Sequence, residues 1–383
     1  MRVENKQIPF RLPAPTSGRV DLLVVAGEHS GDEHAAHAVR GLRAENPDCA
    51  ICALGGPQLE AAGAQLLYDL TVSSVVGFVE VLKSYSFFKA LFEEVLNWIE
   101  KHRPRAVCFV DYPGLNLRLA KALRERGISI KGGGDVKLLY YISPQIWAWK
   151  AKRRFTMARD LDGLAVIFPF EVACYADTDL PVEFVGHPFV APEYVSPVSY
   201  DPAGPLLLLP GSRKQAVARI FPVLLSGLSA YGTEDTVVLY PSEAIRELLE
   251  EARAPAHVRL VKTGVPIAAR AVLTSSGTMS LHCALAGIPG AIAYRTNALT
   301  YLLARWWVKL DYIGIANLLL KEPMYPEYIQ GRAKGEGLAV ELRACTEDQT
   351  RISQTSEQQR RLKGLLDQPT NGTVSKWLAR QLT

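Results

Sequence analysis

Short apolar runs alternate with helix-length amphipathic segments along most of this chain. In the first half, strands are expected at 20–26, 51–54, 106–110 and 137–142, and helices at about 32–44, 84–101 and 115–126. Apolar strands separated by helices indicate βαβ units, whose strands run parallel and are covered on both faces. We therefore predict an α/β fold built on parallel sheets.

The same alternation restarts after a proline-rich interval that contains Pro192, Pro197 and Pro202. Strands are then expected at 206–209, 236–240, 258–261, 271–274 and 291–294, and helices at about 220–228 and 279–286. A chain of 383 residues, 48% of them hydrophobic, can form two cores. We expect a Rossmann-like domain at 1–187, a linker at 188–205, a second Rossmann-like domain at 206–337 and a helical tail at 338–383.

Composition limits the partners and the compartment. A formal net charge of +4 suits anionic small molecules or an anionic membrane surface, and is too small for the dense basic patch of a nucleic-acid binder. Six scattered cysteines, mostly within apolar stretches, indicate reduced thiols and a cytosolic protein. The first twenty residues lack the apolar region of a secretion signal, and no apolar run is long enough to span a bilayer.

Two strand-to-helix junctions in the first half carry acids. Glu28, Ser30 and Asp32 follow the first strand, where Ser30 or Asp32 could cap the helix, while Gly27, Gly31 and Glu28 suit ligand binding. Asp111 directly follows the strand at 106–110 and precedes Pro113-Gly114. It could form a turn, or it could accept a proton from an attacking hydroxyl at the crevice end of the sheet.

Two junctions in the second half lack acids and suit a phosphate. Gly211 follows Pro210 and lets the backbone approach an anion, and Ser212 and Arg213 come next. Ser276, Gly277 and Thr278 form a similar junction before the helix at 279–286. A tight turn with an exposed arginine is the simpler alternative, but two such loops in one domain favour a diphosphate.

Apolar and aromatic residues gather in two further segments. The segment 140–149 contains four aromatic residues and is followed by Lys152, Arg153 and Arg154, a combination that fits either a core strand or a surface for sugars and phosphates. A helical stripe, typical of core, is formed by Phe87, Phe88, Leu91, Phe92, Val95 and Ile99. Together with Val76, Phe78, Val81 and Leu82, this segment is apolar enough to form an exposed patch for acyl chains or a membrane. The residues of this apolar patch are Val76, Phe78, Val81, Leu82, Phe87 and Phe88.

Ten short segments, in order, resemble one family closely. This family is lipid-A-disaccharide synthase, the inverting glycosyltransferase of the bacterial lipid A pathway. The matching segments are Ala26-Gly27-Glu28-His29-Ser30-Gly31-Asp32, Gly55-Gly56-Pro57, 77–82, Asp111-Tyr112-Pro113-Gly114-Leu115-Asn116, Ser143-Pro144-Gln145-Ile146-Trp147-Ala148-Trp149, Pro169-Phe170-Glu171, Phe184-Val185-Gly186-His187-Pro188, Leu209-Pro210-Gly211-Ser212-Arg213, Ser276-Gly277-Thr278 and Asn317-Leu318-Leu319.

The resemblance implies a GT-B fold of two facing Rossmann-like domains. It also implies a reaction between UDP-2,3-diacylglucosamine and 2,3-diacylglucosamine 1-phosphate, giving UDP and a β-1,6-linked disaccharide, without metal or cofactor. By the same resemblance, Asp111 is the general base, and Glu28 and Ser30 lie in the acceptor pocket. The residues implied to bind the UDP-sugar are Arg213, Ser212, Ser276, Gly277, Thr278, His282 and Asn317.

The family further implies a cytoplasmic homodimer, peripheral to the inner membrane through the apolar patch. Two positions depart from its pattern: His282 and Ala216 stand where the family usually has Glu. These changes leave two alternatives open. One is a related UDP-sugar transferase or epimerase with a changed substrate, and the other is a non-catalytic lipid-binding protein of the same fold.

Overall fold

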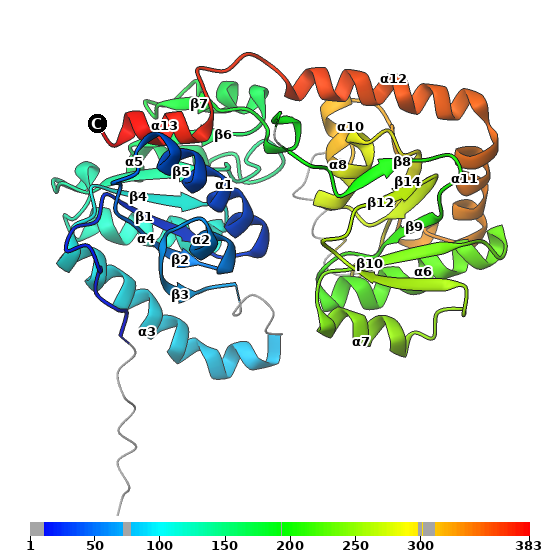
Figure 1. Cartoon of the computed structure of the whole chain (residues 1–383), viewed down its shortest axis with the longest axis horizontal. Coiled ribbons are helices and arrows are strands. Elements are labelled where there is room, and N and C mark those ends of the chain that lie inside the picture. Colours follow the sequence, from blue (N-terminus) through cyan, green and yellow to red (C-terminus); the bar gives the residue numbers. More distant parts are fainter. Residues whose placement is uncertain (1–10, 72–77, 193, 298–300, 302–310) are drawn as a thin grey trace, which may run out of the picture. The chain divides into compact units, whose positions relative to one another are not determined.

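The computed structural model describes residues 11–71, 78–192, 194–297, 301 and 311–383, with the side chains of helix α3 described from residue 87 onward. The chain forms two compact units, drawn in Figure 1. The first unit comprises Met1–Pro188 and Pro369–Thr383, and the second comprises Phe189–Gln368.

The first unit is built on a seven-stranded parallel sheet in the order β3-β2-β1-β4-β5-β6-β7. Its strands are β1 (Leu22–Ala26), β2 (Ile51–Gly55), β3 (Gln65–Asp69), β4 (Ala106–Val110), β5 (Lys137–Tyr141), β6 (Gly163–Val166) and β7 (Val182–Phe184). Its helices are α1 (His29–Glu45), α2 (Pro57–Ala61), α3 (Phe78–His102), α4 (Pro113–Glu125), α5 (Arg153–Asp160) and α13 (Val374–Gln381), with 3₁₀ turns at Ile130–Gly132 and Pro169–Tyr175.

The central strands of this sheet are buried on both faces. Every residue of β1, β2 and β4 is buried, which explains why these sequences are apolar throughout instead of alternating. Leu91, Val95 and Ile99 of α3 pack into the same core at 3% exposure or less. The parallel α/β prediction is therefore confirmed, and the helical stripe is core over these three positions.

The second unit holds a six-stranded parallel sheet in the order β11-β10-β9-β13-β14-β15, and a two-stranded parallel pair, β12-β8. Its strands are β8 (Val198–Tyr200), β9 (Leu206–Leu209), β10 (Thr236–Tyr240), β11 (Val258–Lys262), β12 (Ile267–Ala269), β13 (Ala271–Thr274), β14 (Gly290–Tyr294) and β15 (Glu327–Ile329). Its helices are α6 (Lys214–Tyr231), α7 (Glu243–Glu251), α8 (Thr278–Leu285), α10 (Ile315–Leu320), α11 (Gly335–Glu347) and α12 (Gln349–Leu366), with a 3₁₀ turn at Gln330–Arg332.

The division of the chain differs from the expected boundaries in two places. Residues 189–205, expected to be a linker, belong to the second unit, where β8 pairs with β12. The expected tail at 338–383 is split, because α11 and α12 pack on the second unit while 369–383 joins the first. The reason is that the partner of an amphipathic helix cannot be read from its own periodicity.

Helix α13 is tied into the first unit by its apolar face and by polar contacts. Trp377 is only 1% exposed, Ser375 Oγ donates a hydrogen bond to the Ala38 carbonyl, and Lys137 Nζ donates to the Gln381 carbonyl. Figure 1 shows α13 (red) beside α1 (blue), although they come from opposite ends of the chain. The last fifteen residues thus belong to the first unit, and the apolar face of α13 is buried in it.

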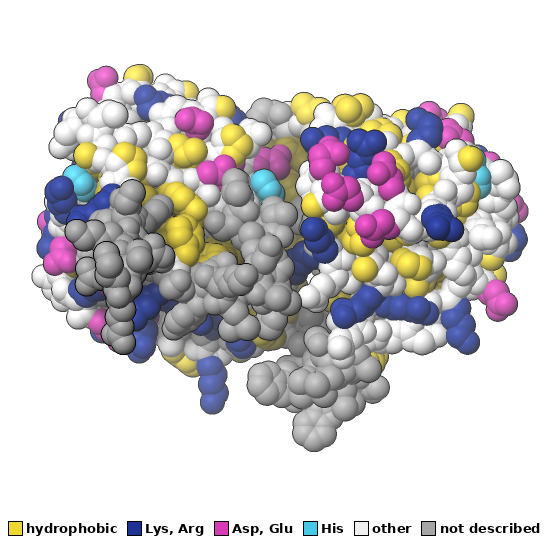
Figure 2. Space-filling view, turned by 90° about the horizontal axis from the view of Figure 1, so that it is seen from below, with side chains coloured by type: hydrophobic (Ala, Val, Ile, Leu, Met, Phe, Trp, Pro, Cys, Tyr) yellow, Lys and Arg dark blue, Asp and Glu magenta, His cyan; other side chains and the backbone are white. Residues whose placement is uncertain are grey.

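Charges are mixed on the surface of both units. Figure 2 shows Lys and Arg side chains interspersed with Asp and Glu on the face it presents. No helix in the described ranges is long and apolar enough to cross a membrane.

Candidate active site

The order of strands reverses between β1 and β4 in the first sheet. Ala26 pairs with Val110 at the carboxyl ends of these strands, so the loops that follow them leave the sheet side by side. Open α/β sheets bind ligands at such a switch point. The predicted residues Glu28, Ser30 and Asp111 all belong to these two loops or to the first turn of α1.

The two loops touch through Gly27 and Tyr112. A Cβ atom on Gly27 would lie 2.2 Å from Cδ1 of the Tyr112 ring, so only glycine fits beneath it. Burial raises the pKa of the Tyr112 hydroxyl, and the negative charge of Glu28 raises it further. Tyr112 thus links the loop that carries Glu28 to the loop that carries Asp111.

Asp111 and Tyr112 both adopt left-handed backbone conformations, with φ of 45° and 46°. This conformation is uncommon for residues other than glycine and costs roughly 1–3 kcal/mol at each position. Three hydrogen bonds hold the Asp111 backbone: its N–H donates to the Tyr141 carbonyl (3.0 Å), and its carbonyl accepts from Tyr140 Oη (2.5 Å) and Asn116 Nδ2 (2.8 Å). The half-buried Asp111 side chain therefore leaves the sheet in a fixed direction.

Glu28 and Asp32 have different roles from those that capping would give them. Glu28 is the N-cap residue of α1, and no side-chain hydrogen bond caps the helix there. Asp32 is 1% exposed and accepts hydrogen bonds from the backbone N–H groups of Gly56 (2.8 Å), Gln58 (2.9 Å) and Leu59 (3.2 Å). The idea that Ser30 or Asp32 caps α1 is wrong: Asp32 anchors the β2–α2 loop, and Ser30 lies half-buried in the first turn of α1.

The second sheet repeats the arrangement between β9 and β13. Leu209 pairs with Thr274, and the N–H of Ser275 donates to the Leu209 carbonyl at 2.8 Å. The loops carrying Ser212 and Arg213, and Ser276, Gly277 and Thr278, therefore emerge at this sheet's switch point. All of them are exposed except the half-buried Ser276, and Arg213 makes no ion pair with a described carboxylate.

Gly211 allows these two loops to approach closely. Its φ of 111° is disfavoured for other residues, and a Cβ there would lie 3.2 Å from Ser275 Oγ. The exposed backbone before α6 and α8 thus offers N–H groups beside an arginine, an arrangement suited to a diphosphate.

Asn317 lies behind the loop at 313–314 and is enclosed by neighbouring residues. It is fully buried, its Nδ2 donates to the Tyr325 carbonyl (2.7 Å) and Glu327 Oε1 (2.8 Å), and its Oδ1 accepts from the Tyr325 N–H. Glu327 in turn accepts from the N–H groups of Ile313 and Gly314, and Ser276 Oγ donates to the Ile313 carbonyl. Asn317 is therefore placed to position Ser276 through the 313–314 loop.

His282 is also buried, at 6% exposure, inside an aromatic cluster of the second unit. Its ring centroid lies 3.9 Å from that of Phe189 and 5.7 Å from that of Tyr194, whose hydroxyl is 3.3 Å from His282 Nδ1. The imidazole of His282 is thus held by aromatic packing.

The chain matches the family model for lipid-A-disaccharide synthetase over residues 22–376. It is 36% identical over 353 residues to the lipid-A-disaccharide synthase of Nitrosococcus oceani, covering 88% of this chain and 89% of that protein. It is 33% identical over 355 residues to the enzyme of Geobacter metallireducens, covering 87% and 90%. The chain belongs to the lipid-A-disaccharide synthetase family. It is therefore a glycosyltransferase of lipid A biosynthesis.

Solved structures show the GT-B fold. A putative UDP-N-acetylglucosamine 2-epimerase from Listeria monocytogenes matches with a TM-score of 0.61 at 12% identity, over 95% of this chain and 96% of that one. A spinosyn rhamnosyltransferase matches with a TM-score of 0.55 at 14% identity, over 95% and 100%. Because an epimerase and a transferase share this fold, the fold alone does not identify the reaction.

The apolar patch lies largely outside the described side chains. Val76 is outside the described residues, and so are the side chains of Phe78, Val81 and Leu82. Phe87 and Phe88 are half-buried, and Phe87 packs against the core beside Tyr68. The described residues include no cluster of three or more potential metal ligands.

The sequence did not single out two residues that hold the Asp111 loop. Tyr140 reads as a strand residue and Asn116 as a helix residue, yet both fix the Asp111 backbone. Asn116 stands in the matching segment that begins at Asp111, which was the one available signal.

Glu171 belongs to another of the matching segments, Pro169-Phe170-Glu171, and is only 1% exposed. Its carboxyl group accepts a hydrogen bond from Trp147 Nε1 at 3.3 Å.

Proposed function

We propose that this enzyme transfers the sugar of UDP-2,3-diacylglucosamine to the 6-hydroxyl of 2,3-diacylglucosamine 1-phosphate, with inversion. The products are UDP and a β-1,6-linked disaccharide 1-phosphate. Beyond the family match, the observation that carries this proposal is Asp111, an acid held by Tyr140 and Asn116 at the switch point of the first sheet.

Asp111 acts as the general base on the acceptor. Its carboxylate takes the proton of the 6-hydroxyl while the hydroxyl oxygen bonds to C1 of the donor sugar and the C1–O bond to UDP breaks. One base suffices for a single inverting displacement, so the second carboxylate of retaining glycosidases is not required. Glu28 and Ser30, on the neighbouring loop, contact the acceptor.

The nucleotide-side residues stabilise the negative charge that develops on UDP. Arg213 pairs with the diphosphate, and Ser212, Ser276, Gly277 and Thr278 offer hydroxyl and backbone donors before α6 and α8. These groups supply the stabilisation that a metal ion would otherwise give, so we propose metal-independent transfer. His282 faces the ribose from its aromatic cluster, and Asn317 contributes through the 313–314 loop.

The proposed substrates carry acyl chains, so the enzyme has to meet them at a membrane surface. We propose that it is a cytoplasmic protein that associates peripherally with the inner membrane through the apolar patch, of which Phe88 is a half-exposed described member. A homodimer is proposed on the family resemblance alone.

The test mixes the purified chain with both proposed substrates in neutral detergent and EDTA, and follows products by mass spectrometry. Disaccharide 1-phosphate together with UDP supports the reaction and its metal independence. UDP release without disaccharide would favour the second candidate, a transferase with a changed acceptor or an epimerase, which the replacement of the usual Glu by His282 favours. Binding of UDP without any turnover would indicate a non-catalytic protein.

A further inference from the structure

The helix that follows β5, the strand beside β4, begins with an arginine. Strand β5 pairs with β4 on the side away from β1, with Tyr141 opposite Val110, and the chain after β5 leads into α5 at Arg153. Helix α5 packs against α4, whose first residues follow Asp111 and Tyr112. Arg153 therefore lies at the carboxyl end of the same sheet as Asp111.

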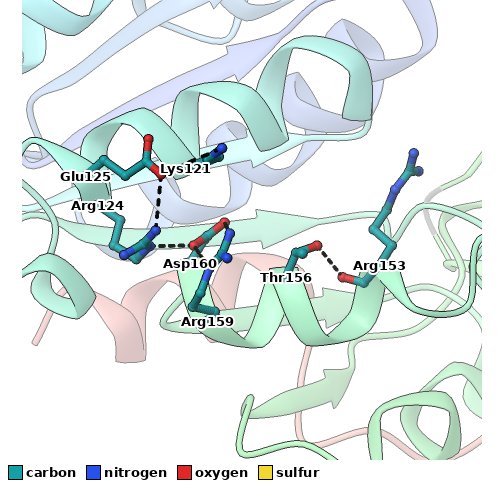
Figure 3. Close-up of polar contacts among 7 residues, drawn as sticks. All are labelled: Lys121, Arg124, Glu125, Arg153, Thr156, Arg159 and Asp160. Atoms are coloured by element: carbon teal, nitrogen blue, oxygen red, sulfur yellow. Dashed lines mark hydrogen bonds and ion pairs between the residues drawn. The ribbon is translucent and has the colours of Figure 1, made fainter.

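Arg153 differs from the neighbouring arginines in having no acidic partner among the residues that the structure describes. Arg124 and Arg159 both bind the buried Asp160, at 2.6 Å and 2.8 Å, and Arg154 binds Asp177 through two hydrogen bonds. Arg153 makes no ion pair with a carboxylate in the described part of the chain. Figure 3 shows its guanidinium turned away from the Asp160 cluster, at the opposite end of α5.

Arg153 and Asp111 act on the same buried hydroxyl. Burial raises the pKa of Tyr140 well above its ordinary value, the negative charge of Asp111 raises it further, and the positive charge of Arg153 opposes this. Tyr140 is the residue that donates to the Asp111 carbonyl. The charge of Arg153 therefore acts on the residue that holds the Asp111 carbonyl, whereas the neighbouring Lys152 is exposed at the N-cap of the helix.

We propose that Arg153 binds the 1-phosphate of the acceptor sugar and so holds the 6-hydroxyl against Asp111. This inference rests on the proposed function. The 1-phosphate and the 6-hydroxymethyl group flank the ring oxygen of the acceptor, so the groups that bind them must lie within one sugar ring of each other. A guanidinium without a carboxylate partner matches a phosphate through two parallel hydrogen bonds.

The test compares Arg153→Gln with the wild type on two acceptors in neutral detergent micelles. One acceptor carries the 1-phosphate, and the other is its 1-O-methyl glycoside. For the phosphorylated acceptor, we expect Arg153→Gln to raise KM roughly 10- to 100-fold with little change in kcat, the scale of a hydrogen-bonded charge pair. For the methyl glycoside, we expect the same KM in both proteins. Lys152→Gln, which removes the same charge one residue away, is the matched control and should leave both KM values unchanged.

Other outcomes overturn the proposal. If Arg153→Gln raises KM equally for both acceptors, Arg153 supports the fold. If it changes KM for neither acceptor, Arg153 does not belong to the acceptor site. If Arg153→Gln loses activity only on vesicles that contain phosphatidylglycerol, and none in neutral detergent, Arg153 binds lipid headgroups instead. If the wild type makes no disaccharide, the proposed function fails. Calorimetric binding of a short-chain diacylglucosamine 1-phosphate to both proteins then still decides the role of Arg153.

Discussion

The hydroxyl of Tyr140 donates a 2.5 Å hydrogen bond to the backbone carbonyl of Asp111. Tyr140 lies in β5 and is fully buried, while Asp111 is the first residue after β4. A core residue of one strand therefore sets the direction in which the acid leaves the neighbouring strand. The proposed base is thus positioned through its main chain.

Tyr140→Phe should lower kcat about tenfold and lower the free energy of unfolding by about 1–2 kcal/mol, because the Asp111 carbonyl loses one of its two donors. KM for the UDP-sugar should not change. Steady-state kinetics and urea unfolding check both effects. Tyr325→Phe is the control: it deletes an equally buried 2.5 Å bond, to the Ile288 carbonyl, and should cost stability without the loss of kcat. Equal kinetic losses in the two variants would contradict the positioning role.

Asp111→Asn should reduce turnover roughly 10²-fold or more, the scale expected for loss of a general base. The backbone network that involves Tyr140, Tyr141 and Asn116 does not use the carboxylate, so the fold and UDP binding should persist. Product formation by mass spectrometry and UDP titration by calorimetry provide the two readouts. Near-normal turnover would remove Asp111 from the mechanism.

Asn317→Ala should destabilise the second unit by about 1–3 kcal/mol, because buried groups of Tyr325 and Glu327 lose their partner. It should also raise KM for the UDP-sugar, since Glu327 and the 313–314 loop support Ser276. Asn116→Ala removes a buried amide from the first unit and should lower kcat instead. The prediction is wrong if Asn317→Ala leaves the donor KM unchanged.

Burial raises the pKa of Glu171 to about 8, from an ordinary value of 4.5. The folded protein therefore binds more protons than the unfolded chain between these values, and stability from this group falls as pH rises from about 4.5 to about 8. Glu171→Gln should melt at a higher temperature than the wild type at pH 8, with the difference shrinking toward pH 5. Melting temperatures of both proteins across this pH range test the prediction. A difference in melting temperature that does not change with pH would show that the burial of Glu171 does not raise its pKa.

Phe88→Ser should weaken sedimentation with anionic liposomes while leaving the melting temperature nearly unchanged, because Phe88 is half-exposed. Leu91→Ser, on the same helix but 2% exposed, should instead lower the melting temperature. Unchanged liposome binding by a folded Phe88→Ser protein would exclude this part of α3 from the membrane contact.

The central strands were predictable because burial on both faces makes them uniformly apolar. The strands at 106–110, 206–209, 236–240 and 271–274 have the bounds expected from the sequence. The edge strands β3, β7 and β15 were not predicted, since most of their residues are only half-buried and their apolar pattern is correspondingly weak. Strand β6 is buried but short, and it follows helix α5 too closely to stand out.

The loops of the candidate site were predictable for a different reason. In parallel sheets the carboxyl ends of the strands converge, so Asp111 and Arg213 could be placed at such ends from the order of elements. What each polar side chain contacts depends on residues far away in the chain. Asp32 binds a neighbouring loop and Asn317 is enclosed by the 313–327 region, and nothing local to either residue indicates this.

The return of α13 to the first unit bears on how the chain is made. Ribosomes release the N-terminus first, and domains generally fold as they emerge. Here the buried side chains of Val374, Trp377 and Leu378 join a unit whose sheet lies entirely before residue 188. The first unit therefore has to wait, with an uncovered apolar surface, until the whole second unit has been translated. A chain cut short before Pro369 would keep that surface exposed, which makes the integrity of the C-terminus a natural point of quality control.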